Sequence, residues 1–189
     1  MINLLGLKET KYAPLPQRKY KIIYADPPWE YLWGDGGKLA PERHYQTIPL
    51  RELCGLRVRS ITDSNCVLAL WVTAPVLPDA FVLINAWGFK YKTILHTWIK
   101  VTKNNVPILG MGSYTRSCTE LLLLGMKGHI KRISTEIVIP QCLLLPREKH
   151  SKKPDIVRSN LVQLFGNLPK IELFARNQNV GWDSWGNEI

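Results

Sequence analysis

The stretch YKIIYADPPW, residues 20–29, combines a β-strand pattern with an abrupt stop. Its tyrosines, isoleucines and alanine are typical of a buried strand. Pro27 and Pro28 have no amide hydrogen, hold φ near about −65°, and push the residue before each of them toward an extended conformation. The pattern therefore predicts a buried strand that ends in a stiff loop. Open α/β sheets bind their ligands at this edge, beyond the carboxyl ends of the strands.

The polar groups of this loop suit an exocyclic amine. The adenine 6-amino group is a poor nucleophile, because its lone pair is delocalised into the ring. The Asp26 carboxylate and the Pro27 carbonyl can each accept one of its N–H bonds and so aim the nitrogen at a methyl donor. An extruded base could stack on Trp29 or on its neighbour Tyr31. The candidate catalytic residues are Asp26, Pro27, Pro28 and Trp29. The alternative is a strand-terminating turn closed by an aromatic plug.

The composition is that of one globular domain, which we expect to span residues 1–189. Hydrophobic residues make up 46% of the chain, and no apolar run is long enough to span a membrane. The start of the chain lacks a basic segment before its short apolar patch, which argues against a signal peptide. The four cysteines are widely spaced, without a C-x-x-C pair. This spacing predicts reduced thiols in a cytoplasmic protein, and no metal site.

The charge balance points to a polyanionic partner. With 25 basic and 15 acidic residues, the net charge is +10, which favours nucleic acid. The alternative is a basic surface that serves solubility alone. Basic residues gather in residues 127–132 and 147–153, and such clusters in loops are typical of phosphate contacts.

Short apolar runs alternate with helical patterns along the chain. We predict strands at residues 21–25, 66–72, 93–99, 119–124, 136–139 and 171–174, and helices at residues 49–61, 75–87 and 154–165. Each predicted helix has a proline in its first turn, where a missing amide costs little. The alternation predicts a three-layer α/β sandwich around a mostly parallel sheet. The connecting segments 31–47 and 103–116 are long enough to be functional loops that close over a substrate.

A second polar loop follows the last predicted strand. It contains amide, guanidinium and carboxylate side chains, which suit ribose hydroxyls, a carboxylate and an amino group. These side chains belong to Arg176, Gln178, Asn179, Asn187 and Glu188. The alternative is a tryptophan-rich lid that only seals the core. The sequence has neither G-x-G-x-x-G nor a P-loop pattern, so it lacks a standard phosphate cradle.

Nine segments, in this order and spacing, carry a resemblance to a known family. They are ADPPW (25–29), HY (44–45), LWVT (70–73), AWGF (86–89), TWIK (97–100), ELLLLG (120–125), HSKKPD (150–155), IELFAR (171–176) and GWDSWGNE (181–188). From residue 20 to residue 189 the chain resembles the MT-A70 family of S-adenosylmethionine-dependent adenine-N6 methyltransferases. The resemblance implies a Rossmann-like methyltransferase fold with a permuted motif order, in which the catalytic motif precedes the cofactor motif.

The resemblance also implies roles for individual residues. Asp26 and Pro27 would bind the target amine, with Asp26 also beside the cofactor. Lys153 would meet the carboxylate end of S-adenosylmethionine and Phe174 would lie near its adenosine. Ribose would face Arg176, Gln178 and Asn179, and the remaining polar groups would face Asn187 and Glu188. The expected substrate contacts are Trp29, Tyr31, Tyr45, Lys100, Glu120 and Lys152.

The expected reaction converts S-adenosylmethionine to S-adenosylhomocysteine without a metal. DNA is the favoured polymer, because this short chain resembles the prokaryotic and phage-type members. The alternatives are the same reaction on RNA, or a catalytically silent nucleic-acid-binding subunit of a methyltransferase complex. A second subunit or a homodimer could complete target recognition.

Overall fold

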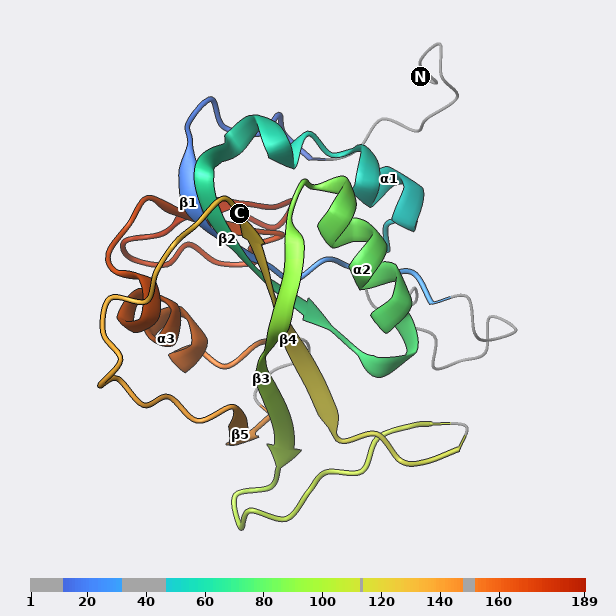
Figure 1. Ribbon diagram of the computed structural model, residues 1–189. Helices are drawn as coiled ribbons and strands as arrows, with labels where there is room; N and C mark the ends of the chain where they lie inside the picture. The colour runs from blue at the N-terminus through green and yellow to red at the C-terminus, as the bar shows by residue number, and fades with distance from the viewer. Residues whose placement is uncertain (1–11, 32–46, 113, 148–151) are drawn as a thin grey trace.

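A single twisted β-sheet forms the middle layer of the protein in the computed structural model, which describes residues 12–31, 47–112, 114–147 and 152–189 (Figure 1). Within these ranges the sheet has seven strands in the order β5-β3-β4-β2-β1-β6-β7. The strands are β1 (Tyr20–Ala25), β2 (Thr62–Val72), β3 (Lys90–Val101), β4 (Thr119–Lys127), β5 (Cys142–Pro146), β6 (Lys170–Leu173) and β7 (Asp183–Trp185).

The sheet is mostly parallel, as predicted. β1 pairs in parallel with both β2 and β6, and the β6–β7 and β3–β5 pairs are also parallel. Only β4 runs against its neighbours β2 and β3 within the described sheet. The amino end of β4 therefore lies at the same edge as the carboxyl ends of β1 and β2, an arrangement that matters for the site.

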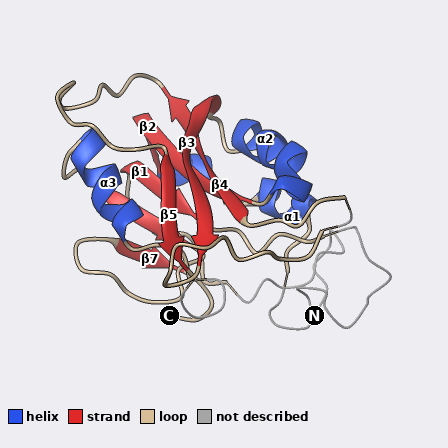
Figure 2. Cartoon of the chain, turned by 90° about the horizontal axis from the view of Figure 1, so that it is seen from below, coloured by secondary structure: helices blue, strands red, loops and turns tan. Residues whose placement is uncertain are grey.

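Helices cover both faces of the sheet (Figure 2). One face carries α1 (Leu50–Gly55), α2 (Leu77–Ala86) and two 3₁₀ turns, Val58–Ile61 and Ala74–Val76, and the other face carries α3 (Ile156–Phe165). Two apolar clusters result, one on each side of the sheet. The three-layer α/β sandwich expected from the sequence is thus confirmed.

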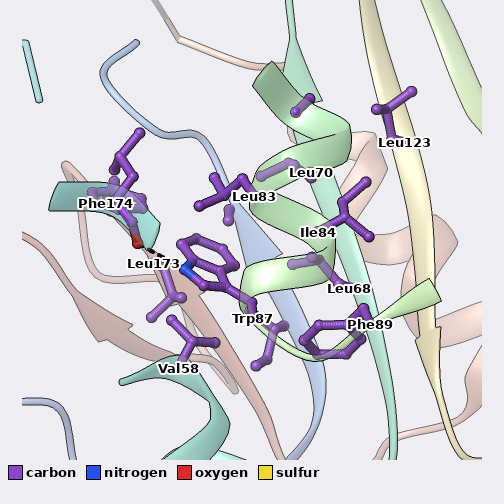
Figure 3. Packing of buried hydrophobic residues seen from close by; sticks show 14 of the residues in the cluster. Val58, Leu68, Leu70, Leu83, Ile84, Trp87, Phe89, Leu123, Leu173 and Phe174 are labelled. Atoms are coloured by element: carbon purple, nitrogen blue, oxygen red, sulfur yellow. Dashed lines mark hydrogen bonds between the residues drawn. The ribbon is translucent and has the colours of Figure 1, made fainter. Parts of the chain in front are cut away.

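Trp87 is central to the cluster on the α1–α2 face. Its ring is fully buried among Leu70, Leu83 and Phe89 (Figure 3). Its indole N–H donates a hydrogen bond of 2.9 Å to the carbonyl of Leu53, so the polar edge of the ring is satisfied inside the core.

Several predicted elements differ from the structure. The predicted strand at residues 136–139 is wrong: this segment is irregular, and the strand begins after Pro140, where Cys142 pairs with Thr97 of β3. The predicted helix at residues 49–61 breaks at Leu56, whose backbone is extended. The sequence also gave no indication of β7. The predicted strand at residues 171–174 ends at Leu173, because Phe174 has φ +61°.

Replacing the buried indole of Trp87 tests this core. We expect Trp87→Ala to lower the free energy of unfolding by about 3–5 kcal/mol, because it leaves a large cavity and removes one of the two hydrogen bonds that the Leu53 carbonyl accepts. Urea titration followed by circular dichroism measures this. Val82→Ala on the exposed side of α2 is the control, with an expected change of at most about 0.5 kcal/mol. Equal losses in the two variants would contradict the assigned role of Trp87.

Candidate active site

A cavity of about 70 Å³ lies at the carboxyl edge of the central strands. It is lined by the end of β1, the end of β2, the amino end of β4 and the segments before α3 and after β6. The lining residues are Asp26, Pro27, Pro28, Trp29, Tyr31, Trp71, Val72, Thr73, Glu120, Lys153 and Arg176. This is the edge at which open α/β sheets bind ligands.

The sheet register places Asp26 in the middle of this edge. Ala25, the last residue of β1, pairs with Leu70 of β2 and with Leu173 of β6. The amide of Asp26 still points to the Leu173 carbonyl, at 3.5 Å. Because Pro27 and Pro28 have no amide hydrogen, the ladder cannot continue beyond this point. The carboxylate therefore stands at the strand end, where its side chain is 24% exposed.

The two proline carbonyls are held by nearby amides. The Pro27 carbonyl accepts a bond of 2.9 Å from the amide of Trp29, and the Pro28 carbonyl accepts one of 2.9 Å from Ile48. A carbonyl oxygen has two acceptor positions. The Pro27 carbonyl therefore keeps one for a further N–H donor, while its direction is fixed by the turn.

Trp29 anchors the loop that follows β1 to strand β2. Its ring is only 5% exposed, and its indole N–H donates to the carbonyl of Trp71 at 3.0 Å. Trp71 in turn donates its indole N–H to the hydroxyl of Tyr24 at 2.7 Å. Burial raises the pKa of Tyr24 well above its usual range, so the hydroxyl stays protonated. The burial of Trp29 leaves Tyr31 as the better placed of the two aromatic residues expected to meet a base.

Tyr31 is partly exposed at the mouth of the cavity. Its hydroxyl lies 2.8 Å from the Thr73 hydroxyl, just beyond the end of β2. The ring is thereby held close to Asp26 without being buried in the core. Tyr45, the other aromatic residue assigned to the substrate, lies outside the described residues.

Four charged side chains form a chain of alternating sign at the cavity. Lys100 is 2.5 Å from Glu120, Glu120 is 3.2 Å from Lys153, and Lys153 is 2.7 Å from Asp26. The Lys153 and Glu120 side chains are only 10% and 11% exposed. In such surroundings charges interact more strongly than in water, and a missing partner is costly. The structure thus brings together residues from four separate segments.

Burial and pairing act against each other on these groups. For Asp26, burial and then the Glu120 charge raise the pKa, and Lys153 only partly opposes them. For Glu120, burial alone would raise the pKa, but Lys153 and Lys100 together lower it. For Lys153, burial would lower the pKa, but Asp26 and Glu120 outweigh it and raise it. The ammonium of Lys153 therefore stays charged throughout the neutral range.

The residues expected to hold a cofactor fall into two groups. Arg176 lines the cavity and pairs with Glu188 at 3.6 Å. Phe174 is buried, with φ +61° and its ring edge-on to Trp185. A positive φ at a residue other than glycine is typical of functional sites. Here the backbone is held by the close approach of Gly186, where a Cβ would lie 2.1 Å from the Ala175 carbonyl oxygen.

The other expected residues lie away from this cavity. Gln178 and Asn179 line a separate hollow beside Trp182, and the Asn179 amide donates to Glu172 at 3.1 Å. Lys152 pairs with Asp155 at 2.7 Å, and Asn187 is exposed near the end of the chain. Among the described residues, no cluster of three or more potential metal ligands occurs, and no helix could cross a membrane.

Sequence reasoning did not assign Tyr24, Trp71 or Thr73 to the site. Tyr24 and Trp71 support Trp29, and Thr73 contacts Tyr31. The signal was available, because the LWVT segment lies at the end of a predicted strand, and that strand, β2, is the direct neighbour of β1 in the sheet. Its polar threonine directly follows three apolar residues, which is typical of a strand end that faces a ligand.

A mostly parallel sheet with a carboxylate, a Pro-Pro turn and a paired lysine at its carboxyl edge defines an α/β protein of the Rossmann-like methyltransferase class. Comparison with known sequences agrees with this class and makes it specific. A sequence model of the MT-A70 family matches residues 20–188, and the chain belongs to this family.

Individual relatives cover the chain to different extents. It is 38% identical to the Type II methyltransferase M.MunI from a Mycoplasma species, over 99% of this chain and 88% of that protein. It is 26% identical to the N6-methyladenosine RNA methyltransferase MTA1 of Pyricularia oryzae, over 99% of the chain and 52% of that protein. It is 24% identical to the human N(6)-adenine-specific methyltransferase METTL4, over 92% of the chain and 38% of that protein. The expected class, an adenine-N6 methyltransferase, is confirmed.

Removal of the Lys153 ammonium tests the charge chain. Without this ammonium, burial raises the pKa of the Asp26 carboxyl further. A folded protein that contains a carboxyl with a raised pKa becomes less stable as the pH rises through that pKa. We therefore expect Lys153→Met to be less stable than the wild type by about 3 kcal/mol near pH 8, and by clearly less near pH 5. Urea unfolding at both pH values measures the difference.

The matched control is Lys127→Met at the opposite edge of the sheet. Lys127 is partly buried like Lys153, but it donates to the Thr62 hydroxyl and not to a carboxylate. Its loss of stability should be the same at both pH values. If Lys153→Met also showed no pH dependence, Lys153 would be acting only through its packing.

Proposed function

We propose that this protein transfers the methyl group of S-adenosylmethionine to the N6 amino group of adenine in DNA, and that Asp26 and Pro27 hold that amino group. The observation that carries the proposal is the pair of acceptors at the end of β1. The Asp26 carboxylate is kept in place by Lys153 at 2.7 Å, and the Pro27 carbonyl is oriented by the Trp29 amide at 2.9 Å. An exocyclic amine has two N–H bonds to satisfy both.

The chemistry of the surrounding side chains fits S-adenosylmethionine. When bound, this cofactor supplies a methyl group that its sulfonium has already activated. The Lys153 ammonium and the Arg176 guanidinium suit its carboxylate, and the ring of Phe174 suits its adenosine. Asn187 and Glu188 offer further hydrogen bonds at the chain end. Gln178 and Asn179 would join the ribose site if their loop turned toward the cavity, since Asn179 now contacts Glu172.

The residues of the site act mainly by positioning. Two acceptors on the N–H bonds aim the nitrogen lone pair away from the Asp26 loop and reduce the freedom of the amine. After the nitrogen is alkylated its proton becomes acidic, and the raised pKa of Asp26 makes this carboxylate a competent acceptor. Lys153 stays charged, and so does not itself accept that proton. Tyr31 offers its partly exposed ring for stacking on the extruded base.

The extent to which the relatives are covered favours DNA as the substrate polymer. The Type II methyltransferase M.MunI matches this chain over most of its own length, whereas the chain spans only about half of the RNA methyltransferase MTA1. The net charge of +10 fits either nucleic acid. Methylation of RNA remains the second candidate, because MTA1 is an RNA methyltransferase.

We also propose that the protein is cytoplasmic and that residues 1–189 form a single domain.

A silent nucleic-acid-binding subunit is less well supported. Such a subunit would have no need for the Asp26 carboxylate paired with a largely buried lysine, since a charge pair removed from water contributes little net stability. Both Asp26 and Lys153 are present and in contact. Retention of this pair is explained by binding of an amine and a cofactor.

Replacement of the proposed amine acceptor tests the function. We expect Asp26→Asn to reduce methyl transfer by at least about a thousandfold, because the new NH₂ group repels the target N–H bonds and leaves Lys153 without one partner. The measurement is transfer of labelled methyl to DNA and, in parallel, to RNA, followed by digestion to nucleosides. N6-methyladenine in DNA is the expected product of the wild type.

Asp63→Asn is the matched control, because Asp63 lies at the opposite edge of the sheet and bonds only to Ser64 and Asn65 in the described contacts. Its activity should equal that of the wild type. Circular dichroism should show that both variants are folded. Wild-type turnover in Asp26→Asn would rule out the amine-binding role, and a product found in RNA alone would overturn the choice of DNA.

A further inference from the structure

The segment between β3 and β4, residues 102–118, projects from the sheet at the active-site edge (Figure 1). We refer to it as the β3–β4 arm. It contains two basic residues, Lys103 and Arg116, and no aspartate or glutamate. Three of its large apolar side chains are strongly exposed: Leu109 by 67%, Met111 by 68% and Tyr114 by 97%.

The described part of the arm is irregular, but backbone hydrogen bonds hold it together. The amide of Thr102 meets the Val106 carbonyl at 2.8 Å, Ile108 meets Lys100 at 2.8 Å, and Gly110 meets Ser117 at 2.7 Å. Near the tip the two halves come so close that a Cβ at Gly112 would lie 1.9 Å from the Thr115 carbonyl oxygen. The exposed apolar side chains therefore stand on a backbone that is folded closely on itself.

The arm is joined directly to the charged site. The two residues at its base, Lys100 of β3 and Glu120 of β4, form the outer pair of the charge chain that ends at Asp26. The same base is fixed by the bond from the Lys100 amide to the Cys118 carbonyl, at 2.8 Å. The base of the arm therefore lies next to the place where the target amine would be held, and the tip projects from that base.

We propose that the tip of the β3–β4 arm inserts Met111 and Tyr114 into duplex DNA beside the target adenine, as a wedge that supports the extruded base. This inference rests on the proposed function. A base that leaves the stack loses stacking energy, and apolar wedges such as Met and Leu commonly replace it in DNA-bending proteins. Lys103 and Arg116 neutralise the flanking phosphates.

The charge of the arm favours DNA over a protein partner or a second copy of the chain. A purely apolar contact would suit a protein surface, but this tip is flanked by positive charge on both sides, without a compensating acid. Two copies that met through their arms would also bring together two chains of net charge +10 each, which is unfavourable. A polyanion with apolar bases between its phosphates satisfies both features.

The experiment separates base extrusion from simple DNA affinity. The methylation sites of the wild-type protein are first mapped on DNA free of N6-methyladenine. Two duplex oligonucleotides with one mapped site are then compared, one with thymine opposite the target adenine and one with an abasic position there. In the second duplex no base pair has to be broken and the target adenine leaves the helix at lower cost, so methylation depends less on the wedge. Initial kcat/KM is measured for Met111→Ala, Tyr114→Ala and the wild type.

We expect each variant to lose at least about tenfold in kcat/KM on the paired duplex and to stay within about threefold of the wild type on the abasic duplex. Val138→Ala, at another strongly exposed apolar residue in the segment between β4 and β5, should match the wild type on both duplexes. Equal losses on both duplexes, or no loss on either, would overturn the wedge.

Two other results have a different meaning. If light scattering showed a wild-type dimer that Met111→Ala converts to a monomer, the tip would be an interface between two copies and the proposal would be wrong. If the wild type transferred no methyl group to DNA at all, the proposed function itself would fail, before any variant was compared.

Discussion

The Lys153 ammonium between the Asp26 and Glu120 carboxylates is the interaction on which the site depends. Two buried carboxylates without a cation between them would repel each other and would be largely protonated. The lysine lies 2.7 Å from one and 3.2 Å from the other, which keeps Glu120 ionised and limits the rise in the pKa of Asp26. It also fixes three segments that are far apart in sequence: the end of β1, the start of β4 and the chain before α3.

The sheet topology makes this meeting possible. If every strand were parallel, the carboxyl edge would carry only residues that follow strands. Because β4 runs against β2 and β3, it brings to this edge a residue that begins a strand, Glu120. The same reversal places the β3–β4 arm beside Asp26, since β3 ends and β4 starts there. One antiparallel strand thus provides both a charged member of the site and the protrusion next to it.

Much of this was predictable from the sequence, and the failures have physical causes. The prolines at 27 and 28 fix the end of β1, and the apolar run of β2 is unambiguous. The edge strand β5 was misplaced, because residues 136–139 look apolar in isolation while the pairing of Cys142 with Thr97 decides the register. The three-residue strand β7 was missed, since it is held by pairing with β6 and by the Trp185 contacts rather than by its own pattern.

The site shows the same division. The tetrapeptide at 26–29 could be recognised because proline restricts the backbone whatever surrounds it. The roles of its individual residues could not be predicted in the same way. The burial of Trp29 depends on the Trp71 carbonyl in β2, which only the fold brings near. Asn179, which we expected beside the cofactor, donates a hydrogen bond to the buried Glu172 in this structure, and its role toward the cofactor stays a prediction. That carboxylate is also paired with Arg158 at 2.7 Å, a partner that lies in α3 and that only the fold brings near.

An ammonium group has three N–H donors, and this limits what Lys153 can do during the reaction. Asp26 and Glu120 occupy two of them, so the third is available for the carboxylate of a bound methyl donor. In the proposed function, Lys153 would then hold the donor without releasing Asp26, and one cation would position both reactants. An arginine in its place would have a planar, rigid set of donors. Such a set suits two acceptors that lie in one plane better than three carboxylates arranged around a single nitrogen atom. The geometry therefore favours lysine at this position.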